Sequence, residues 1–173
     1  ELVAAQARFD EIARQLEVDM AEASRDALTG LANRKGFEEA LQQRIGDCRR
    51  RQSRLSLVLV DVDHFKQIND RHGHPTGDDV LRGLARVLSG AVRQTDLVAR
   101  FGGDEFACIL PFTTLQNATR VAERIRTSVA AGTLLSDGSQ LQITLSTGVA
   151  EFSRDDDAQT VLKRADTALY ASK

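Results

Sequence analysis

Apolar residues recur every three or four positions along most of this chain, which is the spacing of one face of an α-helix. The pattern predicts a first helix without Gly or Pro, a second helix capped by Asn33, and a third that begins near Pro75. It also predicts a short helix or turn and two further amphipathic helices, over residues 66–72, 113–132 and 157–173.

Strands are predicted where apolar residues run together or alternate. Leu57–Val60 is a continuous run of branched apolar residues, which is typical of a strand buried on both faces. Residues 96–101 and 105–111 flank a Gly-Gly turn and predict a hairpin, and residues 141–152 alternate as another strand. The order of these elements predicts an α+β fold, in which helices flank a mostly antiparallel sheet of about five strands.

The first predicted helix, residues 1–25, carries apolar residues at a heptad-like spacing. An amphipathic helix that packs on its own domain explains this stripe, and so does a short parallel coiled coil that joins two copies. We favour the coiled coil, and divide the chain into a stalk over residues 1–25 and a globular domain over residues 26–173. The stripe consists of Leu2, Ala5, Phe9, Ile12, Leu16 and Ala23, and Asp19 interrupts it.

Composition narrows the class of protein. The chain has 173 residues, which suits one domain with an appendage, and its formal net charge of −2 gives no case for binding nucleic acid or a membrane surface. No apolar run approaches the roughly 20 residues that cross a bilayer. Cys48 and Cys108 match no metal-binding spacing, and predict buried thiols in a reducing compartment.

Three acidic residues follow predicted strands. Asp61 comes directly after the buried strand, and Asp104 and Glu105 lie in the hairpin turn beside Gly102 and Gly103. Acids on a solvated turn would be ordinary, but a turn does not need a partner acid at the end of a buried strand. Hard divalent cations prefer carboxylate oxygens, and a pair of such ions can assist phosphoryl transfer. The glycines would let a ligand approach the backbone closely.

Four motifs resemble those of one family, the GGDEF domains of diguanylate cyclases. The hairpin turn reads GGDEF at residues 102–106, and the chain carries DALTGLANR at 26–34. It also carries DVDHFKQINDRHGHPTGDDVL at 61–81 and RADTALYASK at 164–173. The resemblance therefore covers residues 26–173, with the motifs in the family's order and spacing, and it implies a palm-like fold.

The resemblance implies a reaction and its metal site. Members of the family condense two GTP molecules into cyclic di-GMP and release two pyrophosphates, with one GTP held by each domain of a homodimer. Asp61, Asp104 and Glu105 would then be the catalytic acids. Two Mg²⁺ or Mn²⁺ ions would be held by these carboxylates and by the carbonyl of Val62.

The same resemblance implies a substrate site for GTP. The backbone N–H groups of His64 and Phe65 would bind phosphate, and such successive N–H groups form an anion nest. Asn69 and Asp78 match the residues that recognise guanine, whose N1–H and N2–H₂ donors adenine lacks. The remaining matches are Lys66 and Lys173 at the phosphates, His74 near the substrate, and Gly102 and Gly103 in the turn. Asp63 is interpreted as a supporting or structural acid.

RQTD at residues 93–96 matches the family's RxxD inhibitory site, which binds cyclic di-GMP. Arginine can hold a phosphate and stack on a purine, and a carboxylate can accept from guanine. Arg93 and Asp96 are therefore predicted to mediate noncompetitive inhibition by the product, with a secondary contact from Arg124. As a surface ion pair alone, the motif would contribute about 0–1 kcal/mol.

Three other functions compete with this prediction. A catalytically silent GGDEF domain would act as a GTP or cyclic di-GMP receptor, although such members usually have an altered signature. A related nucleotide cyclase or palm domain would share the acids but not the guanine-binding pair. A non-enzymatic dimerisation module would explain only the first helix.

The wider context of the chain is also an expectation. Glu1 stands where a complete chain would have Met, and no signal peptide is visible, which indicates a piece of a longer protein. We expect an upstream sensor domain, a location in the bacterial cytoplasm, and no membrane contact by this piece. A membrane anchor further upstream stays open.

Overall fold

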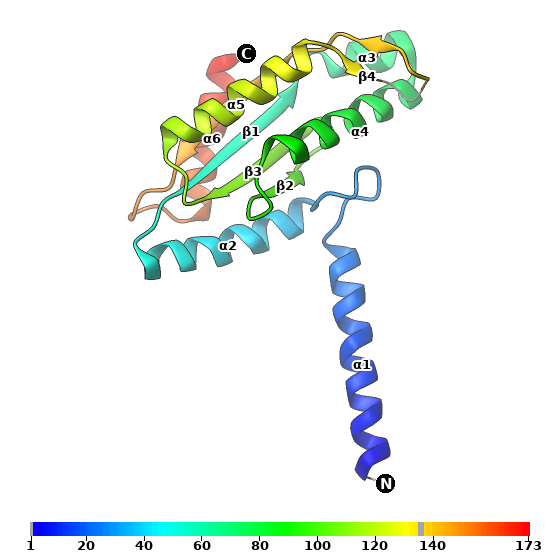
Figure 1. Ribbon diagram of the computed structural model, residues 1–173, viewed down its shortest axis with the longest axis vertical. Coiled ribbons are helices and arrows are strands. Elements are labelled where there is room, and N and C mark those ends of the chain that lie inside the picture. Colours follow the sequence, from blue (N-terminus) through cyan, green and yellow to red (C-terminus); the bar gives the residue numbers. More distant parts are fainter. Residues whose placement is uncertain (1, 135–136) are drawn as a thin grey trace.

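A four-stranded antiparallel sheet forms the centre of the structure, a computed structural model that describes residues 2–134 and 137–173 (Figure 1). Its strands lie side by side in the order β2, β3, β1 and β6. Their bounds are Leu97–Arg100 for β2, Glu105–Pro111 for β3, Leu55–Val62 for β1 and Leu145–Glu151 for β6.

The connections give a split β-α-β arrangement. Strand β3 pairs antiparallel with both β1 and β2, so that β1 and β2 run in the same direction with β3 between them. Helices α3 (Phe65–His72) and α4 (His74–Ala91) connect β1 to β2. Helix α5 (Leu115–Ala130) follows β3 and leads back towards β6. The expected α+β fold with a mostly antiparallel sheet is confirmed.

Helices cover both faces of the sheet, which explains the continuous apolar run in β1. Val58, Val60 and Val62 pack into a core with α4 and α5. Leu57 and Leu59 point to the other face, where α2 (Arg34–Arg51) and α6 (Ala158–Ser172) cover them. Alternate residues of a strand face opposite sides of the sheet, so that only an apolar residue at every position suits a strand buried on both.

Several local predictions are confirmed, and the sheet is smaller than the expected five strands. The Asn33 side chain caps α2 by accepting from the N–H of Gly36 at 3.0 Å. The strand expected over residues 141–152 is divided, because β5 (Gln140–Leu141) pairs with β4 (Thr133–Leu134) in a separate ribbon. Only the part from Leu145 onwards joins the central sheet. Both cysteines are buried and free of disulfides.

Helix α1 (Leu2–Ala23) extends away from the sheet and its covering helices (Figure 1). Large apolar side chains of its predicted stripe are exposed, including Phe9 at 69%, Ile12 at 60% and Leu16 at 56%. Packing of this stripe on its own domain is therefore not observed in the described part. The side chains of Leu2 and Ala5 lie outside the described residues. Within the described ranges, the search for a helix long and apolar enough to cross a membrane finds none.

The turn between α1 and α2 is fastened to the sheet through Arg100. The Arg100 guanidinium lies 3.2 Å from a carboxylate oxygen of Asp26 and donates to the Gly103 carbonyl at 2.8 Å. Its backbone N–H also donates to the Ala32 carbonyl. Asp26 in turn accepts from the N–H and hydroxyl of Thr29. One side chain thus joins the start of the domain to the Gly-Gly turn.

The close contact of β6 with α6 generates a first prediction. Gly148 lies under α6, where a Cβ would overlap the Ala165 carbonyl oxygen and the Leu169 amide nitrogen. Gly148→Ala is expected to lower the free energy of unfolding by about 1–3 kcal/mol, because backbone atoms must move apart. Urea denaturation measures this. Gly90→Ala is the control, since it meets open space on α4 and should be neutral or stabilising.

The Asp26–Arg100 pair generates a prediction that depends on pH. Burial alone would raise the pKa of Asp26, but hydrogen bonds from Thr29 and the charge of Arg100 hold it below its usual value. Asp26→Asn should lower stability by about 1 kcal/mol at neutral pH. A lowered folded-state pKa contributes stability above the ordinary value of 3.8, and this contribution disappears as the pH falls through the folded-state pKa.

The measurement is urea denaturation of wild type and Asp26→Asn at neutral pH and in steps below pH 3.8, along which the two stabilities should approach each other. Asp155→Asn changes an exposed acid and serves as the control. A gap between wild type and Asp26→Asn that stays constant with pH would contradict the role of the carboxylate charge.

Candidate functional site

Two of the predicted acids are directly opposite each other in the sheet. The register of β1 and β3 pairs Asp61 with Glu105, and both lie on the face that α6 covers. Asp61 is 7% exposed, so that its carboxylate is largely removed from water. Like charges opposite each other on neighbouring strands destabilise a sheet. This edge therefore favours a cation.

The pKa values of the two acids also reflect their burial and mutual repulsion. Burial raises the pKa of Asp61, and the charge of Asp104 raises it further, while a hydrogen bond from Lys173 partly offsets both. Burial also raises the pKa of Glu105, followed by the charges of Asp61 and Asp104. The Lys173 ammonium lies 3.0 Å from Asp61, and this contact raises the pKa of the lysine.

The Gly-Gly turn wraps closely around Glu105. A Cβ on Gly102 would lie 2.7 Å from a carboxylate oxygen of Glu105. The N–H of Val62 donates to the Asp104 carbonyl at 3.2 Å, which ties the end of β1 to the turn. A small residue at 102 is therefore required if the Glu105 carboxylate is to lie at this edge.

The donor set fits a hard divalent cation completed by a substrate. Among the residues that the structure describes, no group of three or more His, Cys, Asp or Glu side chains could hold a metal ion by itself. Mg²⁺ in nucleotide enzymes is commonly bound by one or two carboxylates together with substrate phosphates. The buried Asp61 and the half-buried Glu105 meet that requirement, and Asp104 lies close enough to raise the pKa of both.

Asp63 has a structural role in this arrangement. One of its carboxylate oxygens accepts from the Thr144 hydroxyl at 2.7 Å, and the other accepts from the Ser146 hydroxyl at 2.6 Å. These bonds fasten the segment after β1 to β6. They also satisfy the Asp63 carboxylate at both of its oxygens.

The segment after β1 forms an anion nest. His64 has a left-handed backbone with φ 57°, and Phe65 begins α3 directly after it. This alternation turns successive N–H groups to one side, and a helix N-terminus adds a partial positive charge. Within the described residues, no side chain caps these N–H groups. The backbone N–H groups of His64 and Phe65, which were predicted to bind phosphate, therefore lie together at the start of α3.

A cavity of about 400 Å³ collects most of the predicted substrate residues beside this nest. Leu81 and Arg100 also line this cavity, although they are not among the substrate residues predicted from the sequence. Arg100 could have been suspected, because it precedes the Gly-Gly turn by two residues; Leu81 gave no signal, since it looks like an ordinary core residue. The predicted residues in the cavity are Phe65, Lys66, Asn69, His74, Asp78, Gly103 and Asp104.

The side chain of Asn69 has a hydrogen-bond acceptor without a partner in the described residues. Its side-chain oxygen Oδ1 is buried and has no partner among the described residues. Buried polar atoms are almost always hydrogen-bonded, so that this unpaired acceptor is exceptional. Gly77 makes room for this amide, since a Cβ there would collide with Oδ1.

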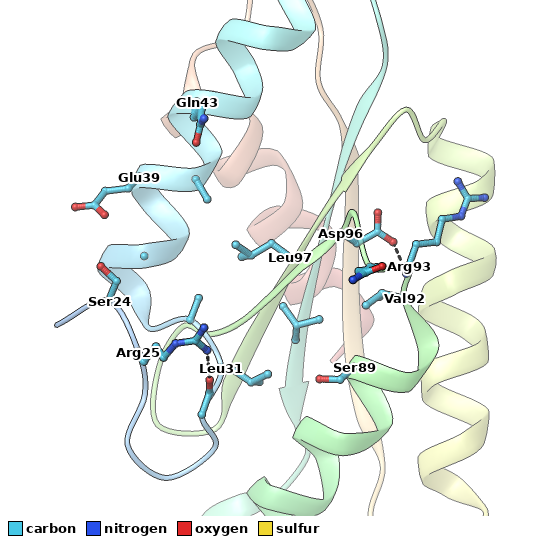
Figure 2. Close-up of a pocket in the computed structure, with 16 residues that line it drawn as sticks. Ser24, Arg25, Leu31, Glu39, Gln43, Ser89, Val92, Arg93, Asp96 and Leu97 are labelled. Atoms are coloured by element: carbon cyan, nitrogen blue, oxygen red, sulfur yellow. Dashed lines mark hydrogen bonds between the residues drawn. The ribbon is translucent and has the colours of Figure 1, made fainter. Parts of the chain in front are cut away.

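The RQTD turn lies at the opposite end of α4 and borders two cavities. Asp96 accepts from the backbone N–H of Arg93 at 2.8 Å, which holds the turn closed. Figure 2 shows the larger cavity, of about 610 Å³, between this turn and residues of α2 such as Glu39 and Gln43. A second cavity of about 290 Å³ lies between the turn and α5, and there Arg93 and Asp96 are joined by Arg124.

The sequence of this chain is similar to those of known proteins. The family model for the GGDEF domain of diguanylate cyclases matches residues 23–173. Diguanylate cyclase DgcP of Pseudomonas aeruginosa is 42% identical over 91% of this chain and 24% of its own length. Diguanylate cyclase TpbB of the same species is 41% identical over 88% of this chain and 35% of its own length. The chain thus spans only a quarter to a third of these relatives.

Solved structures agree in three dimensions. The coiled coil and GGDEF domain of DgcB from Caulobacter crescentus, in complex with c-di-GMP, gives a TM-score of 0.88 at 35% identity. The match covers 99% of this chain and 91% of that chain. Diguanylate cyclase SiaD of Pseudomonas aeruginosa, in complex with its activator SiaC, gives a TM-score of 0.82 at 38% identity, over 99% and 66% of the two chains. The chain belongs to the GGDEF domain family of diguanylate cyclases.

Proposed function

We propose that this chain is a diguanylate cyclase, which condenses two GTP molecules into cyclic di-GMP and two pyrophosphates. The observation that carries the proposal is the cross-strand acid pair of Asp61 and Glu105 beside a cavity that Asn69 and Asp78 line. Phosphoryl transfer from GTP needs carboxylates that can bind a metal ion and a cavity that can bind guanine, and the two lie side by side in this proposal.

Each group has a separate task in this mechanism. Two Mg²⁺ or Mn²⁺ ions, held by Asp61, Glu105, Asp104 and the Val62 carbonyl, would supply positive charge to the phosphates. The N–H groups at the start of α3 receive the terminal phosphates, and the ammonium groups of Lys66 and Lys173 neutralise them. Asp104 lies half-buried in the turn and lines the substrate cavity, where its carboxylate can take the proton of the attacking 3′-hydroxyl.

Selection of guanine is assigned to Asn69 and Asp78, which both line the cavity. The Asp78 carboxylate accepts from guanine N–H groups, and the Asn69 amide does so once its oxygen turns from Gly77 towards the base. Adenine lacks these donors and would leave both acceptors unpaired, which costs several-fold to many-fold in binding. His74 lines the same cavity and would contact the substrate from the side.

The reaction needs two copies of the domain, because each holds one GTP. We infer that residues 1–25 form a coiled-coil stalk for residues 26–173, since the apolar stripe of α1 is exposed in a single chain. In the longer protein, an upstream sensor would act through this stalk in the reducing bacterial cytoplasm. Product inhibition is assigned to Arg93 and Asp96, with Arg124 as a secondary contact, because all three border one cavity.

Turnover of GTP tests the proposal. Wild type with GTP and Mg²⁺ should yield cyclic di-GMP and pyrophosphate, which chromatography separates, whereas ATP should yield no cyclic product. Glu105→Gln should lower the rate at least about 100-fold, since a metal-binding charge is lost from the transition state. Glu123→Gln is the control, because this acid is exposed on α5 and pairs with Arg126 on the same helix.

Two results would overturn the proposal. Equal rates for Glu105→Gln and wild type would mean that the reaction does not depend on a metal ion bound by Glu105. Binding of GTP without any product, even at high protein concentration, would favour the alternative of a catalytically silent GTP or cyclic di-GMP receptor.

The dimer seam is tested by Leu16→Glu in α1. Each apolar side chain buried in a coiled coil contributes about 1.5–3 kcal/mol, so that the dimer Kd should rise at least about tenfold. Analytical ultracentrifugation measures the Kd, and turnover per chain should fall at low protein concentration and recover at high concentration. Arg14→Glu changes a residue off the stripe and is the control. Unchanged association by Leu16→Glu would refute the seam.

A further inference from the structure

Phe112 is an aromatic residue in an unusual position. Its backbone has φ 53°, in the left-handed region, and its side chain is 61% exposed. Bulky residues rarely adopt this conformation, which costs about 1 kcal/mol or more. The Phe112 N–H donates to the Arg54 carbonyl at 2.7 Å, and Thr114 begins the cap of α5 two residues later. Phe112 therefore has an unfavourable backbone conformation, and its ring is not buried in the core.

The ring borders the cavity of about 290 Å³ between the RQTD turn and α5. Three guanidinium groups and one carboxylate line the same cavity, from Arg93, Arg120, Arg124 and Asp96. Figure 2 shows the Arg93 side chain extending away from the larger cavity, towards the helix that follows the hairpin. Its guanidinium has no hydrogen-bond or ion-pair partner among the described residues.

These groups suit a guanine nucleotide with a phosphodiester. Guanidinium groups bind phosphate oxygens, and a carboxylate accepts from the guanine N–H groups. An aromatic face stacks on the base, which in nucleic-acid complexes contributes about 1–3 kcal/mol per base. Phe112 supplies the element that the charged residues lack.

A smaller cavity on the other side of Phe112 is less suitable. Its volume is about 110 Å³, and it also contains Arg44 and Arg54. Arg54 is already paired with Glu151 at 2.6 Å, and Arg44 reaches the Thr95 carbonyl at 3.5 Å. The larger volume is on the side of Arg93. On that side Arg124 donates to the Ala91 carbonyl and Arg120 to the Asn117 side chain, so that the charge without a partner in the described residues is that of Arg93.

We propose that Phe112 stacks on a guanine base of cyclic di-GMP in the cavity between the RQTD turn and α5. This rests on the proposed function, in which cyclic di-GMP is the product, and adds a stacking residue that sets the affinity for it. The strained backbone holds the ring at the mouth of the cavity instead of letting it pack into the core.

Phe112→Asn tests the inference, because Asn tolerates a left-handed backbone and removes the ring. Calorimetric titration with cyclic di-GMP should give a Kd about 5- to 100-fold higher than for wild type. Phe112→Tyr keeps the ring and should stay within about twofold of wild type. The melting temperature of Phe112→Asn should be equal or higher, since strain is released.

Controls separate stacking from general damage. Leu115→Asn makes the same replacement at an apolar residue that is 46% exposed and does not border the cavity, and it should leave the Kd unchanged. Arg93→Ala should weaken binding through loss of a phosphate contact. Cyclic di-AMP should bind at least about tenfold more weakly to wild type, because adenine offers Asp96 no matching donors. Inhibition of turnover that added GTP does not relieve distinguishes this cavity from the substrate site.

The outcomes separate this inference from the proposed function. If wild type makes cyclic di-GMP but Phe112→Asn binds it as tightly as wild type does, the inference is wrong and the cyclase stands. If binding depends on Phe112 but no GTP is turned over, the cyclase is wrong and the stacking role stands. If wild type neither forms nor binds cyclic di-GMP, both are wrong.

Discussion

The register between β1 and β3 is the constraint on which the site depends. It places Asp61 directly opposite Glu105, although two carboxylates in that relation repel each other. A shift by one residue would turn the apolar side chains of β1 to the wrong faces, so that both cores hold the register in place. Core burial therefore stabilises an arrangement that the charges alone would oppose, and the resulting charge is available to bind a cation.

Arg100 links this edge to the entrance of the domain. Its guanidinium bonds the Gly103 carbonyl and pairs with Asp26, which follows the last residue of α1 by only three positions. The N-terminal helix thus enters the domain at a turn that is joined through the Arg100 side chain to the Gly-Gly hairpin. A stalk attached at this point is mechanically close to the acids, although α1 itself extends away from the sheet (Figure 1).

Helix α4 connects the two cavities to which the proposed ligands are assigned. It begins at His74, beside the cavity that contains Asn69 and Asp78, and ends at Ala91, just before the RQTD turn. A helix of 18 residues is about 27 Å long. The proposed substrate and product sites would therefore lie at the two ends of one helix.

The sequence alone determined the features that depend on local patterns: the buried strand β1, the Gly-Gly hairpin, the Asn33 cap and the family motifs with their acids. The strand, the hairpin and the cap follow from periodicity and turn chemistry, which neighbouring residues set, whereas the motifs were identified by their resemblance to a family. Only the tertiary structure decided that Lys173 lies on Asp61, 112 positions away, and that Arg100 pairs with Asp26, 74 positions away. It also decided the unpaired oxygen of Asn69 and the left-handed backbone of Phe112. Such features arise from packing between distant segments, whose geometry no local pattern encodes.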